Sequence, residues 1–184
     1  QDTHAGGAAG SGKAAAHDRA FKELRQLTPQ EFDIRIAADG RWYHEGGLIG
    51  RPALVKLFST VLRREADGSY WLVTPVERGR IEVEDAPFII TALAVSGAGE
   101  AQQLTFRTNV DDEVHLGPGH PLAMRMPSQG GEDLRPYIMV RDGLEALVAR
   151  PVFYELAEMS QPGPDGLLGV WSGGAFFPLE GEDR

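Results

Sequence analysis

The stretch VERGRIEVEDAPF at residues 76–88 is similar to a later stretch, VRDGLEALVARPVF at residues 140–153. Each copy reads as a strand-like run, a turn and a second run. Three identical pairs, 64 positions apart, define the match: Val76 with Val140, Gly79 with Gly143, and Pro87 with Pro151. Upstream of each copy, a similar short motif occurs: GRP at residues 50–52 and GHP at residues 119–121, 69 positions apart. This internal repeat predicts two similar halves with a groove between them.

The amino-acid composition restricts the classes of protein to which the chain can belong. The chain has 184 residues and 42% hydrophobic content, which is enough to bury a core. Its 27 Asp and Glu residues outnumber 18 Lys and Arg residues, giving a net charge of -9. The negative electrostatic field of such a protein repels the phosphate backbone of nucleic acids, so we expect no nucleic-acid partner.

Cysteine and long apolar runs are both absent from the sequence. The lack of cysteine excludes disulfides, thiol nucleophiles and thiolate metal sites. The longest apolar run, residues 88–95, is far shorter than the ~20 residues that span a bilayer, so no membrane partner is expected. The first residues lack the basic region and apolar core of a signal peptide. We therefore expect a cytoplasmic protein.

The first half combines a tail, helices and strands. Residues 1–16 are rich in Gly, Ala and Ser and predict a flexible tail. Apolar residues at helical spacing predict a short helix over residues 18–26. Residues 32–36 and 42–44 alternate in polarity around Asp39-Gly40, which predicts a β-hairpin.

A second helix is predicted after Pro52. Proline suits the first helical turn, and an apolar stripe follows it over residues 51–65. Residues 70–95, broken at Pro75, Gly79 and Pro87, predict three strands. Two more strands are expected at residues 103–110 and 112–116.

The C-terminal part reads mainly as strands. We expect them at residues 137–141, 144–149 and 152–159, followed by a Gly-rich strand or pair of strands at the end. The fold class is therefore α+β, with short, mostly antiparallel strands and one or two helices in each half. The predicted division is a tail (1–16), an N-terminal half (17–97) and a C-terminal half (98–184).

Conventional catalytic motifs are missing. GAAGSGK at residues 7–13 has the spacing of a phosphate-binding loop, but Ala14 replaces the hydroxyl that would hold magnesium. The sequence contains no HExxH and no GxSxG. Glu82 and Glu84 alternate with apolar residues, as on a solvated strand face, and Asp85 is placed to fix a turn. We therefore predict no catalytic residue, no metal and no cofactor.

Arginines and aromatic residues are the better candidates for a ligand site. Fifteen of the 18 basic residues are Arg, whose planar guanidinium suits a bound carboxylate or phosphate. Binding sites combine flat apolar surface with a few convergent polar groups. The candidate ligand-binding residues are Trp42, His44, Arg51, Glu77, Asp85, His120, Arg141, Tyr154 and Trp171.

Three functions remain open from the residues. The first is a soluble, non-enzymatic ligand-binding or signalling module that holds a small anionic molecule between its halves. The second is an enzyme for a small phosphorylated or carboxylated substrate, with His44 or His120 as acid-base and Asp85 or Glu77 as its partner. The third is a protein-interaction module, which an exposed apolar patch around Phe176 and Phe177 would favour.

Three long segments carry a family resemblance: GRWYHEGGLIGRPALVKLF (40–58), DGSYWLVTPVERGRIEVEDAPF (67–88) and RPYIMVRDGLEALVARPVFYEL (135–156). In wording and order they resemble a proteobacterial family known as domain of unknown function 1285, over residues 32–175. The resemblance implies two similar α+β halves, the second loosely like pleckstrin-homology domains. It further implies a small, nucleotide-like ligand in the cleft, and a signalling role with a protein partner. It supplies no catalytic residues.

Overall fold

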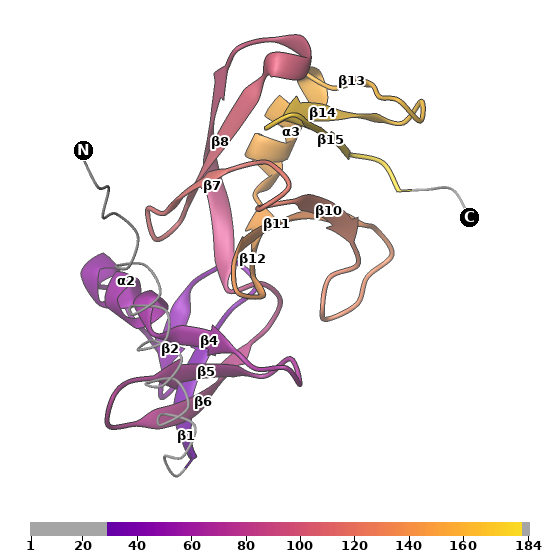
Figure 1. The fold of residues 1–184 in the computed structure, drawn as a ribbon. Helices are drawn as coiled ribbons and strands as arrows, with labels where there is room; N and C mark the ends of the chain where they lie inside the picture. Colours follow the sequence, from indigo (N-terminus) through magenta and orange to yellow (C-terminus); the bar gives the residue numbers. More distant parts are fainter. Residues whose placement is uncertain (1–28, 182–184) are drawn as a thin grey trace, which may run out of the picture.

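A computed structural model describes residues 29–181 (Figure 1). The tail predicted for residues 1–16 and the helix predicted for residues 18–26 lie outside this range. The N-terminal half is a six-stranded sheet in the order β3-β2-β1-β6-β5-β4. Its elements are β1 (Gln30–Ile36), β2 (Trp42–His44), β3 (Gly47–Leu48), α2 (Pro52–Thr60), β4 (Leu62–Arg64), β5 (Tyr70–Val73) and β6 (Arg78–Val83).

The C-terminal half contains a second six-stranded sheet, in the order β10-β11-β12-β7-β8-β9, and a small sheet in the order β13-β14-β15. Its elements are β7 (Phe88–Ser96), η1 (Gly99–Ala101), β8 (Gln103–Thr108), β9 (Glu113–His115), β10 (Leu122–Arg125), β11 (Arg135–Arg141), β12 (Leu144–Val148), α3 (Arg150–Glu158), β13 (Gln161–Pro162), β14 (Leu168–Ser172) and β15 (Ala175–Pro178). No helix in the described part of the chain is long and apolar enough to cross a membrane.

The two large sheets share one topology. Each consists of two three-stranded antiparallel meanders, and the first strand of one meander pairs in parallel with the last strand of the other. These parallel pairs are β1 with β6 and β7 with β12. The helix differs in position, since α2 lies between the meanders of the N-terminal half and α3 follows those of the C-terminal half. The predicted α+β fold with two similar halves is confirmed.

The residues of the internal repeat are not structurally equivalent, although their strands are. β6 and β12 occupy the same place in their sheets. Gly79, however, lies inside β6 opposite Leu72, whereas Gly143 forms the turn before β12 with φ of 78°. The predicted boundary at residues 97/98 is also displaced. Because β7 is a central strand of the second sheet, the sheets divide between Val83 and Phe88.

The predicted N-terminal hairpin is confirmed, and the helix after it is shorter than predicted. Ile36 pairs with Trp42 around a turn in which Gly40 has φ of 86°. α2 ends at Thr60 instead of residue 65. Near its end, the Ser59 hydroxyl donates to the Lys56 carbonyl at 2.6 Å. Such side-chain bonds compete with the helical pattern, and the chain turns into β4.

Residues 152–159, predicted as a strand, belong to helix α3. Val152 and Leu156, four positions apart, are its buried residues. This i, i+4 spacing identifies a helix face, and the Val and aromatic residues around it suggested a strand instead. Pro151 sits in the first turn, where its missing N–H costs nothing.

The second sheet curls into a partly closed barrel. Its edge strands β9 and β10 are joined by a short turn in which the His120 N–H donates to the Gly117 carbonyl at 3.0 Å. The residues on either side of the turn extend the pairing of each edge strand with its neighbour in the sheet. The Leu116 N–H donates to the Leu104 carbonyl, and the Met139 N–H donates to the Pro121 carbonyl. The two edges therefore meet at this turn. The small third sheet caps the barrel through Ser172, whose hydroxyl donates to the Leu116 carbonyl at 2.6 Å.

The two halves pack closely against each other. A single hydrophobic cluster contains buried residues of both sheets, including Ile36 and Phe88. At its margin, Arg141 in β11 donates to the Ser59 carbonyl at 2.6 Å. The β1–β2 turn also approaches β7 so closely that a Cβ at Gly40 would lie 2.6 Å from the Ile89 side chain.

This close approach predicts a specific cost for Gly40→Ala. The substitution strains the backbone at φ of 86° and forces Ile89 away from the turn, so we expect a loss of about 1–3 kcal/mol of stability. Gly68→Ala is the matched control, since Gly68 has the same φ and its nearest neighbour would lie 3.9 Å away. Urea unfolding should show the larger loss for Gly40→Ala. Equal losses of stability in the two variants would mean that the close approach of Gly40 to Ile89 does not add to the cost of the substitution.

Candidate functional site

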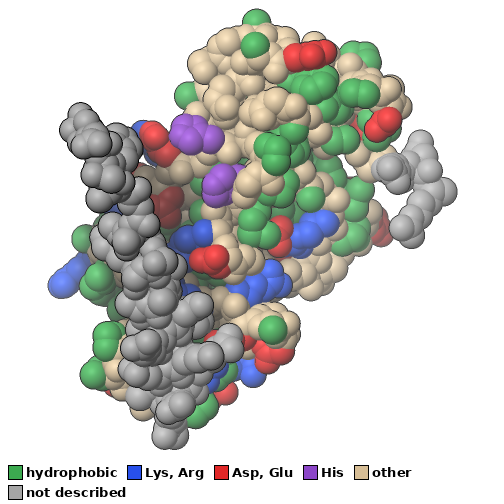
Figure 2. Space-filling view, in the orientation of Figure 1, with side chains coloured by type: hydrophobic (Ala, Val, Ile, Leu, Met, Phe, Trp, Pro, Cys, Tyr) green, Lys and Arg blue, Asp and Glu red, His purple; other side chains and the backbone are tan. Residues whose placement is uncertain are grey.

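A cavity of about 740 Å³ opens where the two halves meet. It is called the junction cavity below. Its walls come from β1, the start of β5, β6, the linker between the sheets and the loop after β10. Charged side chains gather across the middle of the face seen in Figure 2, where the two halves of Figure 1 adjoin. The cavity is therefore lined by both halves and by the linker.

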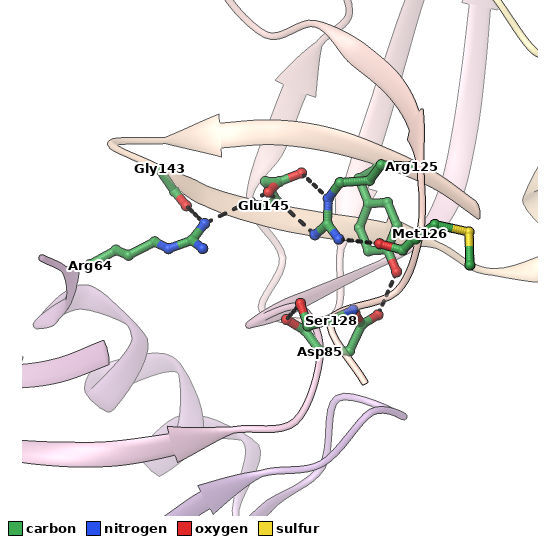
Figure 3. Close-up of polar contacts among 8 residues, drawn as sticks. Arg64, Asp85, Arg125, Met126, Ser128, Gly143 and Glu145 are labelled. Atoms are coloured by element: carbon green, nitrogen blue, oxygen red, sulfur yellow. Dashed lines mark hydrogen bonds and ion pairs between the residues drawn. The ribbon is translucent and has the colours of Figure 1, made fainter. Parts of the chain in front are cut away.

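Asp85 anchors the linker at this cavity. It is 5% exposed, and its Oδ2 accepts a hydrogen bond from the Tyr137 hydroxyl at 2.7 Å. Its Oδ1 accepts from the Ser128 backbone N–H at 2.8 Å (Figure 3). The Ser128 hydroxyl also donates to the Asp85 carbonyl at 3.4 Å. A buried carboxylate needs such partners, and here they fix the linker to the C-terminal half.

A second group of charges continues from this anchor toward the N-terminal half (Figure 3). Arg125 donates to both carboxylate oxygens of Glu145, at 3.2 and 3.3 Å, and its guanidinium lies 3.6 Å from the Tyr137 ring centre. Arg64 of β4 reaches across to the Gly143 carbonyl at 3.0 Å and lies 3.7 Å from Glu145. Glu145 thus sits between two guanidinium groups, one from each half. Bidentate Arg–carboxylate pairs fix geometry as well as charge.

Tyr137 joins the two groups of contacts. It is 1% exposed, with its hydroxyl on Asp85 and its ring under Arg125. Burial raises the pKa of Tyr137 well above its usual range, and the hydrogen bond to Asp85 raises it further. Tyr137 is therefore a neutral hydrogen-bond donor at physiological pH.

The charged lining of the junction cavity is mixed. The carboxylates are Glu31, Asp33, Glu82 and Asp85, and the guanidinium groups are Arg64 and Arg80. Tyr70 adds an aromatic face, with the Arg64 guanidinium 5.1 Å from its ring centre. Burial raises the pKa of the Tyr70 hydroxyl. Such a lining suits a polar molecule with one anionic group and several hydrogen-bond donors.

A second cavity, of about 460 Å³, lies between α2 and the first sheet. It is called the α2 groove below. Its floor is apolar, formed by Phe32, Ile34, Phe58, Val61 and Leu72. Its rim holds the carboxylates of Glu31, Asp33, Glu45 and Glu77, together with His44. In the described part of the chain, no group of three or more His, Asp or Glu residues is arranged to hold a metal ion.

Comparison with known families accounts for nearly all of the described chain. Residues 26–86 match the model "Domain of unknown function (DUF1285), N-terminal domain", and residues 87–179 match "Protein of unknown function (DUF1285), C-terminal domain". The chain belongs to the DUF1285 family. The family resemblance stated from the sequence is thereby confirmed.

Two solved DUF1285 structures are similar to this chain. A DUF1285 family protein from Silicibacter pomeroyi DSS-3 is 44% identical, with 85% of each chain covered and a TM-score of 0.76. A DUF1285 family protein from Shewanella baltica OS155 is 24% identical, with 70% of this chain and 92% of that chain covered and a TM-score of 0.53. The second likeness concerns the fold alone. No curated protein matches the chain.

The predicted site residues of this DUF1285 chain do not form one cluster. Asp85 lines the junction cavity, while His44 and Glu77 line the α2 groove. His44 lies 3.9 Å from Glu45, and no hydrogen bond joins it to Glu77 among the described residues. His120 is bound through Nδ1 to the Met139 carbonyl, within the barrel turn. The enzyme hypothesis stays a prediction, and no hydrogen bond between a His and a carboxylate is found among residues 29–181.

The remaining predicted residues have other surroundings. Trp42 is 1% exposed and stacks on Phe58 in the core, and Arg141 ties β11 to α2. Arg51 precedes α2 on the surface, and Tyr154 is 61% exposed on α3. Trp171 packs edge-on against Phe176. Because Phe177 is 7% exposed, the apolar patch proposed there is largely covered.

Residues that sequence reasoning missed supply much of the junction cavity. Arg64 and Arg80 carry its positive charge, Tyr70 its aromatic face and Ser128 its contact with the linker. Tyr70 and Arg80 have the aromatic and cationic side chains that suit a ligand site, but their positions in the sequence do not distinguish them from the other aromatic and Arg residues. Ser128 lies in a loop without periodicity, so no local pattern marks it.

The buried hydrogen bond predicts a stability cost for Tyr137→Phe. The variant leaves Asp85 Oδ2 without its donor in a buried place, so we expect a loss of about 1–3 kcal/mol. Tyr154→Phe is the control, since that side chain is largely exposed and should change stability by less than about 0.5 kcal/mol. Urea denaturation measures both. Indistinguishable midpoints would contradict the role given to the bond.

The raised pKa of Tyr137 predicts a pH dependence of stability. The folded state holds this proton more tightly than the unfolded chain, whose tyrosines ionise near pH ~10. The stabilising contribution of neutral Tyr137 to the folded state is therefore fully present below about pH 10. It is lost as the pH rises toward the pKa of Tyr137 in the folded protein. Urea midpoints measured at increasing pH should fall more steeply for the native protein than for Tyr137→Phe. Parallel curves would rule out this linkage.

Proposed function

We propose that this protein is a ligand-binding module whose small-molecule ligand occupies the junction cavity. The observation that carries the proposal is a cavity of about 740 Å³ lined by the N-terminal half, the linker and a loop of the C-terminal half. Its volume lies within the range of ~300–1,000 Å³ common for small-molecule sites. An occupant of this size would touch both halves at once.

The lining narrows the chemistry of the proposed ligand. Four carboxylates against two guanidinium groups would repel a polyanion, whereas one anionic group near Arg80 is acceptable. The carboxylates can accept hydrogen bonds from hydroxyl groups, and Tyr70 offers a flat surface. A nucleoside monophosphate has this combination. We therefore propose a singly phosphorylated, nucleotide-like ligand in place of the general anion expected from the sequence.

The anchor at Asp85 supports a signalling role. Asp85 lines the cavity and also holds the linker to Ser128 and Tyr137. A ligand group that binds this carboxylate competes with those contacts and changes the surface of the C-terminal half near them. That surface is where we propose a protein partner would respond. The cytoplasmic location stays a prediction.

The proposal is tested by thermal shift with three probes: adenosine, adenosine 5′-monophosphate and adenosine 5′-triphosphate, at constant ionic strength. The monophosphate should raise the melting temperature most, because it meets Arg80 without excess negative charge. Arg80→Gln should weaken its binding roughly tenfold, the value of one charged hydrogen bond of about 1.5 kcal/mol.

Arg107→Gln is the matched control, because Arg107 is an exposed arginine on β8 that pairs with Glu113 outside the junction cavity. It should bind the monophosphate like the native protein. If no probe stabilises the protein, or if both arginine variants lose binding equally, the proposed ligand class is wrong.

A further inference from the structure

The second half of β7 is paired on one side only. β12 pairs with residues 88–90 of β7, and the next bond runs from the Ala149 N–H to the Ile90 carbonyl at 3.1 Å. Pro151 then lies in the first turn of α3, where a residue without an N–H cannot continue a β-ladder. In the described part of the chain, no strand pairs with residues 91–96 on the side away from β8.

The strand register shows which backbone groups face this open side. Leu104 of β8 lies opposite Val95. The Leu104 carbonyl accepts from the Leu116 N–H at 3.0 Å, and the Leu104 N–H donates to the Ser172 hydroxyl at 2.9 Å, so both groups point away from β7. Val95 and Leu104 therefore form a non-hydrogen-bonded pair, and the N–H and C=O of Val95 point away from β8. The same holds for Leu93, two residues earlier in the strand.

The end of α3 lies beside this open edge (Figure 1). A shallow groove of about 340 Å³, called the α3 groove below, is lined by Leu93, Val95, Glu155, Glu158 and Met159. No Lys or Arg lines it. Neither glutamate forms an ion pair with another residue of the described chain. An occupant of the groove therefore meets free backbone groups, apolar side chains and two unpaired carboxylates.

The sequence of the open edge leaves it available to another strand. Residues 91–96, TALAVS, contain no charged residue and no proline. Val95 is 47% exposed. Soluble proteins normally protect such an edge with charge or proline, because it readily pairs with another chain. An open strand edge beside a helix-lined groove suits the binding of an extended peptide.

We propose that the α3 groove binds an extended, basic segment of a partner protein, which adds to β7 as a further strand. The backbone of the segment bonds to the N–H and C=O groups of Leu93 and Val95. Its apolar side chains cover Leu93, and its Lys or Arg side chains pair with Glu155 and Glu158. This site does not rest on the ligand proposed for the junction cavity, since the two share no lining residue.

Hydrogen exchange tests the strand addition directly. The probe is an acetylated and amidated six-residue peptide of alternating Lys and Val. With free peptide at ten times its dissociation constant, exchange of the Leu93 and Val95 amides should slow about tenfold, because both become hydrogen-bonded. The Ala94 amide faces β8 and should exchange at an unchanged rate. Unchanged exchange at Leu93 and Val95, whether or not the peptide binds elsewhere, would overturn the proposal.

Val95→Pro removes one of the backbone donors that the added strand uses. It breaks no bond to β8, because the Val95 N–H points the other way. Peptide binding, measured by fluorescence anisotropy, should weaken about tenfold, which corresponds to one hydrogen bond of about 1.4 kcal/mol. Val95→Thr is the matched control, since it keeps the N–H and the branched side chain and should bind like the native protein. Equal affinities of the two variants would contradict strand addition.

Charge reversal on α3 tests the preference for a basic segment without altering β7. Glu155→Lys combined with Glu158→Lys should weaken binding of the Lys–Val peptide, and a Glu–Val peptide should not bind the native protein. The control combines Glu132→Lys with Asp133→Lys, which makes the same charge change in the exposed loop between β10 and β11. Equal losses in both double variants would show that only the overall charge attracts the peptide, and would refute the α3 groove as its site.

Sedimentation of the native protein without peptide separates a partner segment from a second copy of the chain. The native protein and Val95→Pro should sediment alike, because the edge of β7 awaits a different molecule. A native dimer that Val95→Pro dissociates would show that a second copy pairs with this edge, and would replace the basic partner.

Discussion

The parallel pairing at the centre of each sheet is the constraint on which the molecule depends. β6 is central in the first sheet and β7 is central in the second, and residues 84–87 alone connect them. So short a connection joins the sheets middle to middle, because an extended residue spans only ~3.5 Å. The linker must therefore pass through the interface between the halves. Asp85 is buried because the linker passes through this interface, although a carboxylate by itself favours exposure to water.

The junction is stabilised by directional contacts at its margin as well as by apolar packing. Asp85 is satisfied by Tyr137 and Ser128, and Glu145 is held by Arg64 and Arg125. Burying charge in this way contributes little net stability, since desolvation offsets much of the attraction. It does penalise every arrangement of the halves in which a partner is missing. The polar contacts thus select one relative position of two similar units.

The sequence was informative where signals are local. The β1–β2 hairpin follows from alternation around Asp39-Gly40, and the start of α2 from Pro52. α3 was missed because its β-prone residues form a helix face only when packed on the barrel, which no local pattern reports. The repeat indicated duplication correctly, yet it aligned a strand glycine with a turn glycine.

The candidate site was harder to predict than the fold because it depends on contacts between distant segments. Of the nine predicted residues, Asp85 alone lines the junction cavity. Trp42 and Arg141 were chosen for chemical types that suit ligands, but the same types suit a buried core and a contact between halves. Ser128 lies 43 positions from Asp85, and only the folded linker brings them together.

The turn that joins β9 to β10 also decides how the protein avoids unwanted strand addition. At this turn the backbone groups of Gly117 and His120 bond to each other and are not available to another chain, whereas β9 and β10 remain edge strands. Within residues 29–181, the edge strands of the first sheet, β3 and β4, are not joined in this way. Both are very short, and β4 carries two adjacent arginines, Arg63 and Arg64. Two halves with one topology thus limit strand addition in different ways: the second joins its edge strands by a short turn, and the first has short edge strands, one of which carries charge.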